Sequence, residues 1–142
     1  MRDEIVLDAS VATDWLLPGP RSTTAPLTFA RSGARRIAPD LIFAEFVSVA
    51  AKFVRRGIVS KWTAREAVER LPQLLDEVAP LGDLARPAYD LATGYGFSAY
   101  DAVYLALARQ RDVPLVTADA KLARRAVDMG MAGHVRLISL EP

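Results

Sequence analysis

Four acidic residues occupy positions at which carboxylates could act together: Asp8, Glu45, Asp101 and Asp119. Asp101 stands out first, because it is the only charged residue between Phe97 and Ala108, in a stretch with the pattern of a helix that is apolar almost all round. Burying a carboxylate in such a helix costs several kcal/mol unless something pairs with it. We therefore predict that Asp101 and the other three acids share a divalent metal ion.

Two of the acids follow predicted strands. The run 5–7 is short, β-branched and apolar, which is typical of a buried strand, and it ends at Asp8. The segment 113–117 is the next clearest strand, and Asp119 lies just beyond it. In parallel α/β sheets, ligands bind beyond the carboxyl ends of the strands. Asp8 and Asp119 are therefore expected at the ligand-binding edge of the sheet.

The other two acids are expected in the first turns of helices. The apolar spacing predicts helices at 41–56 and 99–111, with Glu45 and Asp101 near their amino ends. In this architecture the amino ends of helices meet the carboxyl ends of strands along one edge. All four acids can therefore converge there, although they are far apart in the sequence.

The remaining predicted elements alternate in the same way. Further strands are expected at 35–39, 78–81 and 135–140. Further helices are expected at 11–17, from Thr23 or Thr24 to Gly33, at 60–75, at 84–95 and at 120–129. Ser10, Asp40 and Ser60 are the predicted N-caps of the helices that follow them. The alternation predicts one α/β domain over residues 1–142, with a central, mostly parallel sheet between two layers of helices.

The composition limits the function class. Of the 142 residues, 51% are hydrophobic, which is enough for a sizeable core, and none is cysteine. The lack of cysteine excludes disulfide scaffolds, thiolate zinc sites and thiol nucleophiles, and it favours the cytoplasm. A net charge of +1 argues neither for nor against nucleic acid. The short, charged amino-terminal segment and the absence of a long apolar run predict neither a signal peptide nor a membrane span.

Each acid also has a purely structural explanation. Asp119 can cap the helix after it, Asp101 follows Ser98 in a capping-box pattern, and Glu45 can interact with a helix dipole. Asp8 is harder to explain in this way, because the end of a buried strand points it into the crevice. Capping does not explain why all four acids should reach the same edge.

Carboxylates gathered at one edge raise one another's pKa values or recruit a cation. Hard oxygen ligands, without cysteine or paired histidines, suit Mg²⁺ or Mn²⁺. Such an ion lowers the pKa of an attacking water and stabilises developing charge on a phosphate. The four acids therefore indicate phosphodiester hydrolysis.

Several other residues lie near these acids in the predicted fold. Ser10 and Thr117 can hydrogen-bond an acid or a metal-bound water, although a cap and an ordinary strand residue explain them equally well. The best of three basic clusters for contacting a nucleic-acid backbone begins two residues after Asp119 and consists of Lys121, Arg124 and Arg125.

Two aromatic residues have open roles. His134 is the sole histidine, and a structural or surface role explains it more simply than a role as ligand or base. Trp62 lies in a predicted helical hairpin over 41–75, where it is either an exposed anchor for a protein partner or a core residue.

The acids lie in four short segments: Ile5-Val-Leu-Asp8-Ala-Ser10, Ala44-Glu45-Phe46, Tyr100-Asp101-Ala-Val-Tyr-Leu-Ala-Leu-Ala108 and Leu115-Val-Thr-Ala-Asp119-Ala-Lys-Leu122. In order, spacing and total chain length these segments resemble the successive motifs of PIN-domain ribonucleases. They look most like the VapC toxins of bacterial and archaeal toxin–antitoxin pairs. The resemblance covers essentially the whole chain.

The resemblance implies a PIN-like fold and a Mg²⁺- or Mn²⁺-dependent endoribonuclease that acts as the toxin of a type II toxin–antitoxin system. It places the family's metal ligands at Asp8, Glu45, Asp101 and Asp119, and the family's hydroxyl near the first or fourth acid at Ser10 and Thr117. It also implies an RNA substrate, a homodimer and a small antitoxin protein that threads a segment across the active site.

Two other function classes stay open. A non-catalytic module of the same fold, binding RNA or protein, would use the acids only as caps. Another phosphoryl-handling α/β protein fits less well. A haloacid-dehalogenase-like phosphatase needs an acid where Ser10 stands, and a response-regulator receiver needs a lysine where Asp119 stands. No Walker loop or G-x-G-x-x-G motif is present, so nucleotide-cofactor binding is disfavoured.

Overall fold

The computed structural model describes residues 3–17 and 33–138. A five-stranded sheet runs through the centre of this part of the chain in the order β3-β2-β1-β4-β5. Its strands are β1 (Glu4–Leu7), β2 (Arg35–Pro39), β3 (Glu77–Ala79), β4 (Leu115–Thr117) and β5 (Val135–Leu137). All four pairings between these strands are parallel, which confirms the predicted sheet.

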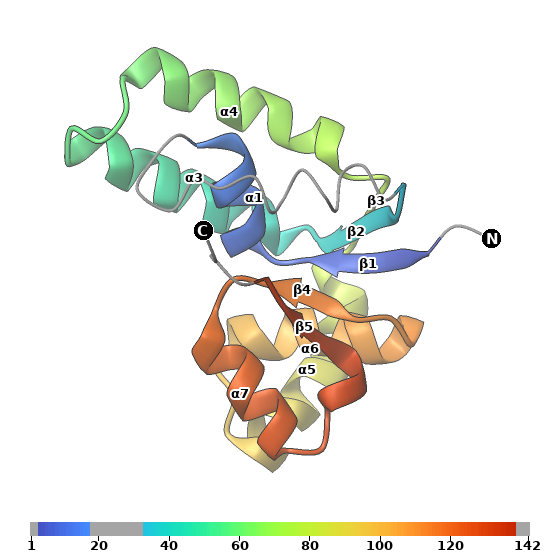
Figure 1. The fold of residues 1–142 in the computed structure, drawn as a ribbon. Coiled ribbons are helices and arrows are strands. Elements are labelled where there is room, and N and C mark those ends of the chain that lie inside the picture. The colour runs from blue at the N-terminus through green and yellow to red at the C-terminus, as the bar shows by residue number, and fades with distance from the viewer. Residues whose placement is uncertain (1–2, 18–32, 139–142) are drawn as a thin grey trace.

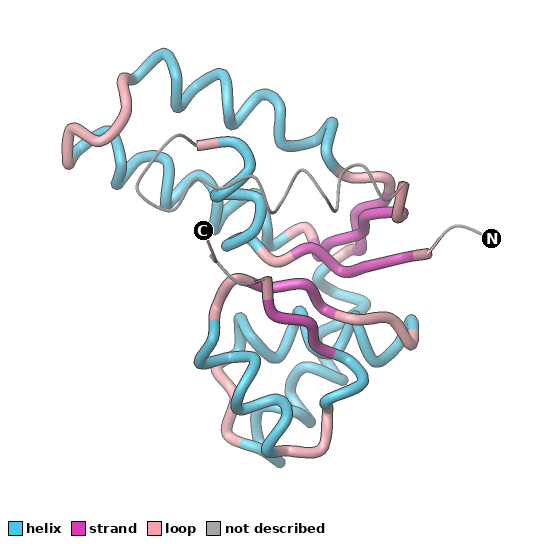
Figure 2. The backbone as a smooth tube through the Cα atoms, viewed as in Figure 1, coloured by secondary structure: helices cyan, strands magenta, loops and turns pink. Residues whose placement is uncertain are grey.

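Helices cover both faces of the sheet. The helices on one face are α1 (Ala9–Leu16), α3 (Leu41–Arg55) and α4 (Lys61–Leu74), and those on the other are α5 (Leu81–Tyr95), α6 (Ala99–Arg111) and α7 (Ala120–Asp128) (Figure 1). In Figure 2 the magenta strands lie between these two cyan groups of helices. The predicted three-layer α/β/α architecture is therefore confirmed. No helix in the described ranges is long and apolar enough to cross a membrane.

The centre of the sheet joins segments from opposite ends of the chain. Strand β1 pairs with β4 in a register that sets Leu7 beside Val116, and the amide of Asp8 donates to the Val116 carbonyl oxygen at 3.0 Å. Because both strands run in the same direction, Asp8 and Thr117 come next to each other at the carboxyl edge. The register therefore decides which residues meet at that edge.

Helix α6 has the predicted bounds and the predicted burial. All seven residues from Ala102 to Ala108 are buried, and the helix packs against α5 and against strands β1 and β2. The hydroxyl oxygen of Ser98 accepts a hydrogen bond from the Asp101 amide at 3.1 Å, which caps the helix. The helix therefore starts at a fixed point, with Asp101 in its first turn.

The predicted N-cap at Ser10 is wrong, while the cap at Ser60 is confirmed by its bond from the Thr63 amide. Helix α1 begins at Ala9, so Ser10 lies inside its first turn. Asp40 occupies the predicted N-cap position of α3, but its backbone angles are helical and its side chain makes no capping hydrogen bond. Its carboxylate instead accepts from the Leu81 amide at the start of α5.

Some predicted elements differ in length or fall outside the described residues. The strand expected at 78–81 is formed by Glu77–Ala79, and the strand expected at 135–140 ends at Leu137. The predicted helix that Thr23 or Thr24 would cap lies outside the described residues, as does the end of the last predicted strand.

Candidate metal centre

Asp8 stands at the carboxyl end of the central strand β1 and is only 9% exposed. Two hydroxyl groups donate to the same carboxylate oxygen, Oδ2: Ser10 at 2.5 Å and Thr117 at 2.8 Å. The same hydroxyl oxygens also accept from backbone amides, Ser10 from Ala118 at 3.0 Å and Thr117 from Asp119 at 3.0 Å. The Asp8 carboxylate is therefore held in one orientation by residues from α1 and β4.

Glu45 reaches the same region from helix α3. The helix begins at Leu41, so Glu45 lies in its second turn, and the prediction of a first-turn position is wrong. The helix dipole acts mainly within the first turn, so it does not explain this residue. Glu45 is half-buried, and within the described residues its Oε1 atom is buried without a hydrogen-bond partner. A buried carboxylate oxygen of this kind is costly unless it binds something.

The remaining two acids come from the amino ends of α6 and α7, where both take part in capping. Asp101 is half-buried in the first turn of α6. Asp119 is exposed and is the N-cap of α7, where its Oδ1 atom accepts from the amides of Lys121 and Leu122. Capping is therefore part of what Asp119 does, and both bonds use the same one of its two oxygens.

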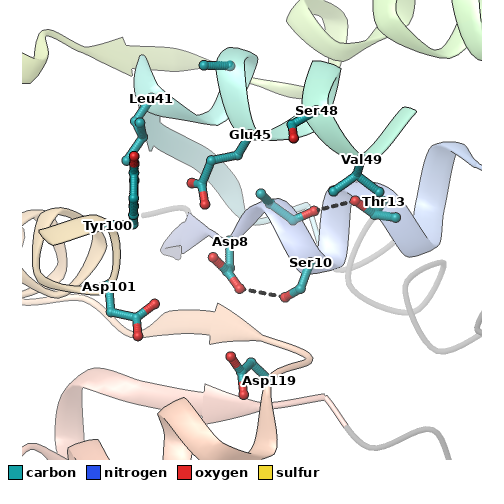
Figure 3. A pocket seen from close by; sticks show the side chains of 12 residues that line it. Asp8, Ser10, Thr13, Leu41, Glu45, Ser48, Val49, Tyr100, Asp101 and Asp119 are labelled. Atoms are coloured by element: carbon teal, nitrogen blue, oxygen red, sulfur yellow. Dashed lines mark hydrogen bonds between the residues drawn. The ribbon is translucent and has the colours of Figure 1, made fainter. Parts of the chain in front are cut away.

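All four acids line one pocket, which is about 470 Å³ in volume (Figure 3). Each comes from a different element, and Figure 3 shows Asp8 between Glu45 on one side and Asp101 and Asp119 on the other. The rest of the lining is small or aliphatic, apart from hydroxyl groups and one aromatic ring: Ala9, Ser10, Thr13, Leu41, Ala44, Ser48, Val49 and Tyr100. No lysine or arginine is among these residues. Within the described chain, therefore, no positively charged side chain of the lining balances the four carboxylates.

The pKa values of the acids agree with this excess of negative charge in the pocket. Burial raises the pKa of Asp8, and the charge of Asp119 adds to the effect, while the hydroxyls of Ser10 and Thr117 oppose it. Burial is also the main cause that raises the pKa of Glu45; the Tyr104 hydroxyl opposes the shift, and the charges of Asp8 and Asp101 add to it.

Asp101 follows the same pattern, since burial and then the charges of Asp8 and Asp119 raise its pKa. The capping bond at Ser98 and the positive charge of Arg125 oppose the shift. Three of the four carboxyl groups thus have raised pKa values, mainly because they are buried, and the repulsion between the acids adds to this effect.

These residues fit a hard divalent cation. All the donors are carboxylate or hydroxyl oxygens, as Mg²⁺ and Mn²⁺ prefer. As they stand, however, no three Asp, Glu or His side chains within residues 3–17 and 33–138 are close enough to hold an ion by themselves. Mg²⁺ commonly keeps several waters and uses one or two carboxylates directly. The pocket therefore suits an ion that is bound partly through water.

The sequence model of the PIN domain matches residues 5–128 of this chain, a range that includes all four acids. The chain belongs to the PIN-domain family. The chain is 34% identical over 122 residues to "Ribonuclease VapC1" of Mycobacterium tuberculosis, and the alignment covers 85% of this chain and 90% of that protein. It is 28% identical over 124 residues to "Ribonuclease VapC3" of Pyrobaculum aerophilum, covering 86% and 94%.

The fold of this PIN domain is also similar to that of a chain in a solved VapBC2 structure. The chain superposes on a chain of VapBC2 from Rickettsia felis, bound to a DNA fragment from their promoter, with a TM-score of 0.69 and 10% sequence identity. The superposition covers 94% of this chain and 98% of that chain. At this identity the similarity shows the fold alone.

The three basic residues that follow Asp119 differ in their exposure and in their contacts. Lys121 and Arg124 are exposed on α7. Arg125 is partly buried, donates from Nη2 to the Gly96 carbonyl oxygen at 3.1 Å, and lies 5.1 Å from the centre of the Phe97 ring. Arg125 is therefore engaged with the connection between α5 and α6.

Two tyrosines at this site were not predicted from the sequence. Tyr100 lines the pocket and is 59% exposed. Tyr104, one turn further along α6, is 1% exposed, and the charges of Glu45 and Asp8 add to burial in raising its pKa. The only sequence signal for them was their position, next to Asp101 and three residues after it.

The two aromatic residues with open roles are now placed. His134 ends a short 3₁₀ helix (Ala132–His134), and its Nε2 atom lies 3.0 Å from Asp112 Oδ1, away from the residues that line the pocket. Trp62 is 73% exposed, which excludes the alternative of a core residue. The guanidinium of Arg65 lies 5.9 Å from its ring centre.

Proposed function

We propose that this PIN domain is a Mg²⁺- or Mn²⁺-dependent endoribonuclease. The observation that carries the proposal is that four carboxylates, from four separate elements, line a single pocket that has no basic residue in its lining. Such a pocket repels the phosphates of RNA unless a cation is present. The similarity to VapC ribonucleases along most of the chain supports the same reaction.

The proposed roles follow from the contacts of each residue. Asp8, Glu45, Asp101 and Asp119 would hold the ion, directly or through water. Ser10 and Thr117 would keep the Asp8 carboxylate oriented by donating to its Oδ2 atom. A bound ion of this type lowers the pKa of an attacking water and neutralises charge on the phosphate.

Cleavage of a fluorescent single-stranded RNA, with Mg²⁺, Mn²⁺ or EDTA, tests this proposal. The wild-type protein should cut RNA only with the metals, and Asp8→Asn and Asp101→Asn should lower the rate by at least about 100-fold, as expected for the loss of a metal ligand. Asp90→Asn is the matched control, because Asp90 is exposed on α5 and does not line the pocket. Equal cutting by Asp8→Asn and Asp90→Asn would overturn the proposal.

The alternative is a non-catalytic PIN-fold module that binds RNA or protein. Thermal melting separates the two functions, because a ligand that binds only the folded state must raise Tm. A metal-dependent nuclease should melt at a higher temperature with Mn²⁺, and Asp101→Asn should reduce this rise. A module whose acids serve only as caps should melt at the same temperature with and without the metal.

For the substrate, we propose that Lys121 and Arg124 contact the RNA backbone. Both are exposed on α7, whose first residue directly follows Asp119. Ion pairs with phosphates release counterions, so these contacts should weaken as the salt concentration rises. Arg125, which the sequence grouped with them, is already bonded within the protein.

For the biological role, we propose a type II toxin that forms a homodimer and is inhibited by a cognate antitoxin protein. The resemblance of the four acidic segments to those of VapC toxins implies an antitoxin partner, and Trp62 on the α3–α4 hairpin is a candidate anchor. Expression alone should arrest growth, and a pull-down from the native host should recover a small partner protein. Recovery of no small protein would contradict this role. Sedimentation of the purified protein tests the dimer.

A further inference from the structure

We propose that Tyr100 is a stacking platform for an unpaired nucleobase of the RNA next to the phosphate at the metal centre, an inference that rests on the proposed function. Tyr100 immediately precedes Asp101 in the first turn of α6 and lines the same pocket as the four acids. Figure 3 shows its side chain between those of Leu41 and Asp101. It is the only aromatic residue in the lining of this pocket within the described chain.

Tyr100 has no evident structural task. Its side chain is 59% exposed, and it makes no hydrogen bond or ring contact with any other residue in the described ranges. By contrast, Tyr104 on the same helix is fully buried in the core. A large aromatic ring left open at the rim of a polar pocket is the kind of surface on which a base can stack.

Because the pocket is negatively charged, an uncharged contact with RNA contributes importantly to affinity. Its lining carries four carboxylates and no lysine or arginine, so it offers no direct ion pair to the phosphates of RNA. Affinity close to the reacting phosphate must then come from the metal ion and from uncharged contacts. Tyr100, with Leu41 beside it, provides an aromatic surface for such an uncharged contact (Figure 3).

The proposal also specifies the form of the substrate. Bases in a duplex are stacked on each other, whereas bases in loops and single strands can turn out onto an aromatic side chain. Every base has a π-face, so this contact selects unpaired RNA without selecting a sequence. The protein should therefore prefer single strands and loops to a duplex of the same sequence.

The test compares Tyr100→Ala, Tyr100→Leu and Tyr100→Trp with Tyr89→Ala. Tyr89 is a matched control, because it is a 67% exposed helical tyrosine on α5 that does not line the pocket. Two quantities are measured: the KM for cleavage of single-stranded RNA with Mn²⁺, and the Kd for the same fluorescent RNA in an Asp8→Asn background. Circular dichroism and Tm show that each variant is folded.

Tyr100→Ala and Tyr100→Leu should raise both KM and Kd about 5- to 150-fold, the loss that corresponds to one stacked base. Tyr100→Trp should keep the affinity, because it keeps an aromatic face, and Tyr89→Ala should change nothing. The loss at Tyr100 should be the same at low and high salt, since stacking releases no counterions.

The outcomes distinguish this inference from the proposed function. If the wild-type protein neither binds nor cuts RNA with Mg²⁺ or Mn²⁺, the proposed function fails and the stacking platform fails with it. If the wild type cuts RNA but Tyr100→Ala behaves like Tyr89→Ala, only the stacking platform is overturned. The same holds if Tyr100→Leu, which has an apolar side chain without a ring, retains the wild-type affinity.

Discussion

The hydroxyl of Thr117 donates to Asp8 Oδ2 at 2.8 Å, across 109 positions of the sequence. Thr117 is fully buried, and its oxygen also accepts from the Asp119 amide at 3.0 Å. One side chain therefore connects two of the four acids, at the point where β1 and β4 end side by side. The predictions below start from this pair.

Thr117→Val should weaken the metal centre while keeping the shape of the buried side chain. Without the hydroxyl, Asp8 loses a donor and the Asp119 amide loses its acceptor, which should cost about 1–3 kcal/mol of stability. The Mn²⁺ concentration for half-maximal cleavage should rise about 10- to 100-fold, while Thr117→Ser should stay close to wild type. Thr93→Val is the control, because its hydroxyl bonds only to carbonyls of its own helix. An unchanged Mn²⁺ requirement in Thr117→Val would contradict this role.

Asp119→Asn and Asp119→Ala should separate capping from metal binding. Asparagine keeps an oxygen for the amides of Lys121 and Leu122, so metal-free Asp119→Asn should retain nearly the stability of wild type. Alanine removes the cap and should cost about 1 kcal/mol. Both variants should reduce the Mn²⁺-induced rise in Tm, because both lack the charge. A full rise in Asp119→Asn would show that Asp119 is a cap alone.

The stability of the metal-free protein should depend on pH through Asp8. Burial raises the pKa of Asp8, so the folded protein holds that proton more tightly than the unfolded chain does. The resulting stability is present below the unfolded pKa of about 3.9 and is lost as pH rises through the higher folded pKa. Asparagine avoids this loss, so Asp8→Asn should melt higher than wild type at pH 7.

This difference in Tm should close as the pH falls below about 3, where Asp8 is protonated in both states. Melting curves in EDTA at a series of pH values measure it, and Asp90→Asn on the exposed face of α5 should show no such trend. If Asp8→Asn instead melts lower than wild type at pH 7 in EDTA, the pKa of Asp8 is lowered, not raised. Added Mn²⁺ should reverse the order at pH 7, because it stabilises only the protein with the complete set of acids.

Arg124 and Arg125 are adjacent in sequence but should behave differently. Arg124→Ala should weaken RNA binding and reduce the slope of log Kd against log salt by about 1, as for the loss of one phosphate contact. Arg125→Ala should instead lower Tm, because it removes bonds to the carbonyls of Tyr95 and Gly96 and the contact with the Phe97 ring. Salt titrations of RNA binding and melting curves distinguish the two. Equal salt slopes for Arg124→Ala and wild type would contradict the phosphate contact.

Local patterns in the sequence were enough for much of the fold. Helix α6 has its predicted bounds, because its apolar run and the cap at Ser98 both act within a few residues. For the opposite reason the predicted cap at Ser10 is wrong, and Asp40 makes no capping bond although it stands at the N-cap position of α3. Each of these side chains has a distant partner, Ala118 for Ser10 and Leu81 for Asp40, which local spacing does not reveal.

The sequence by itself determined the alternation of strands and helices, the identity of the four acids and the edge of the sheet at which they belong. These follow from hydrophobic periodicity and from the direction of parallel strands, both of which can be read from the chain. Only the tertiary structure decided which groups touch. The register of β1 against β4 sets Thr117 beside Asp8.

The same distinction holds along a single helix. Tyr100 and Tyr104 are four residues apart on α6, a spacing that puts side chains on the same face, yet one is 59% exposed and the other 1%. The first turn of α6 borders the pocket, whereas the next turn packs into the core. The spacing of residues along a helix predicts which of them share a face. Only the neighbouring elements determine which part of that face is buried.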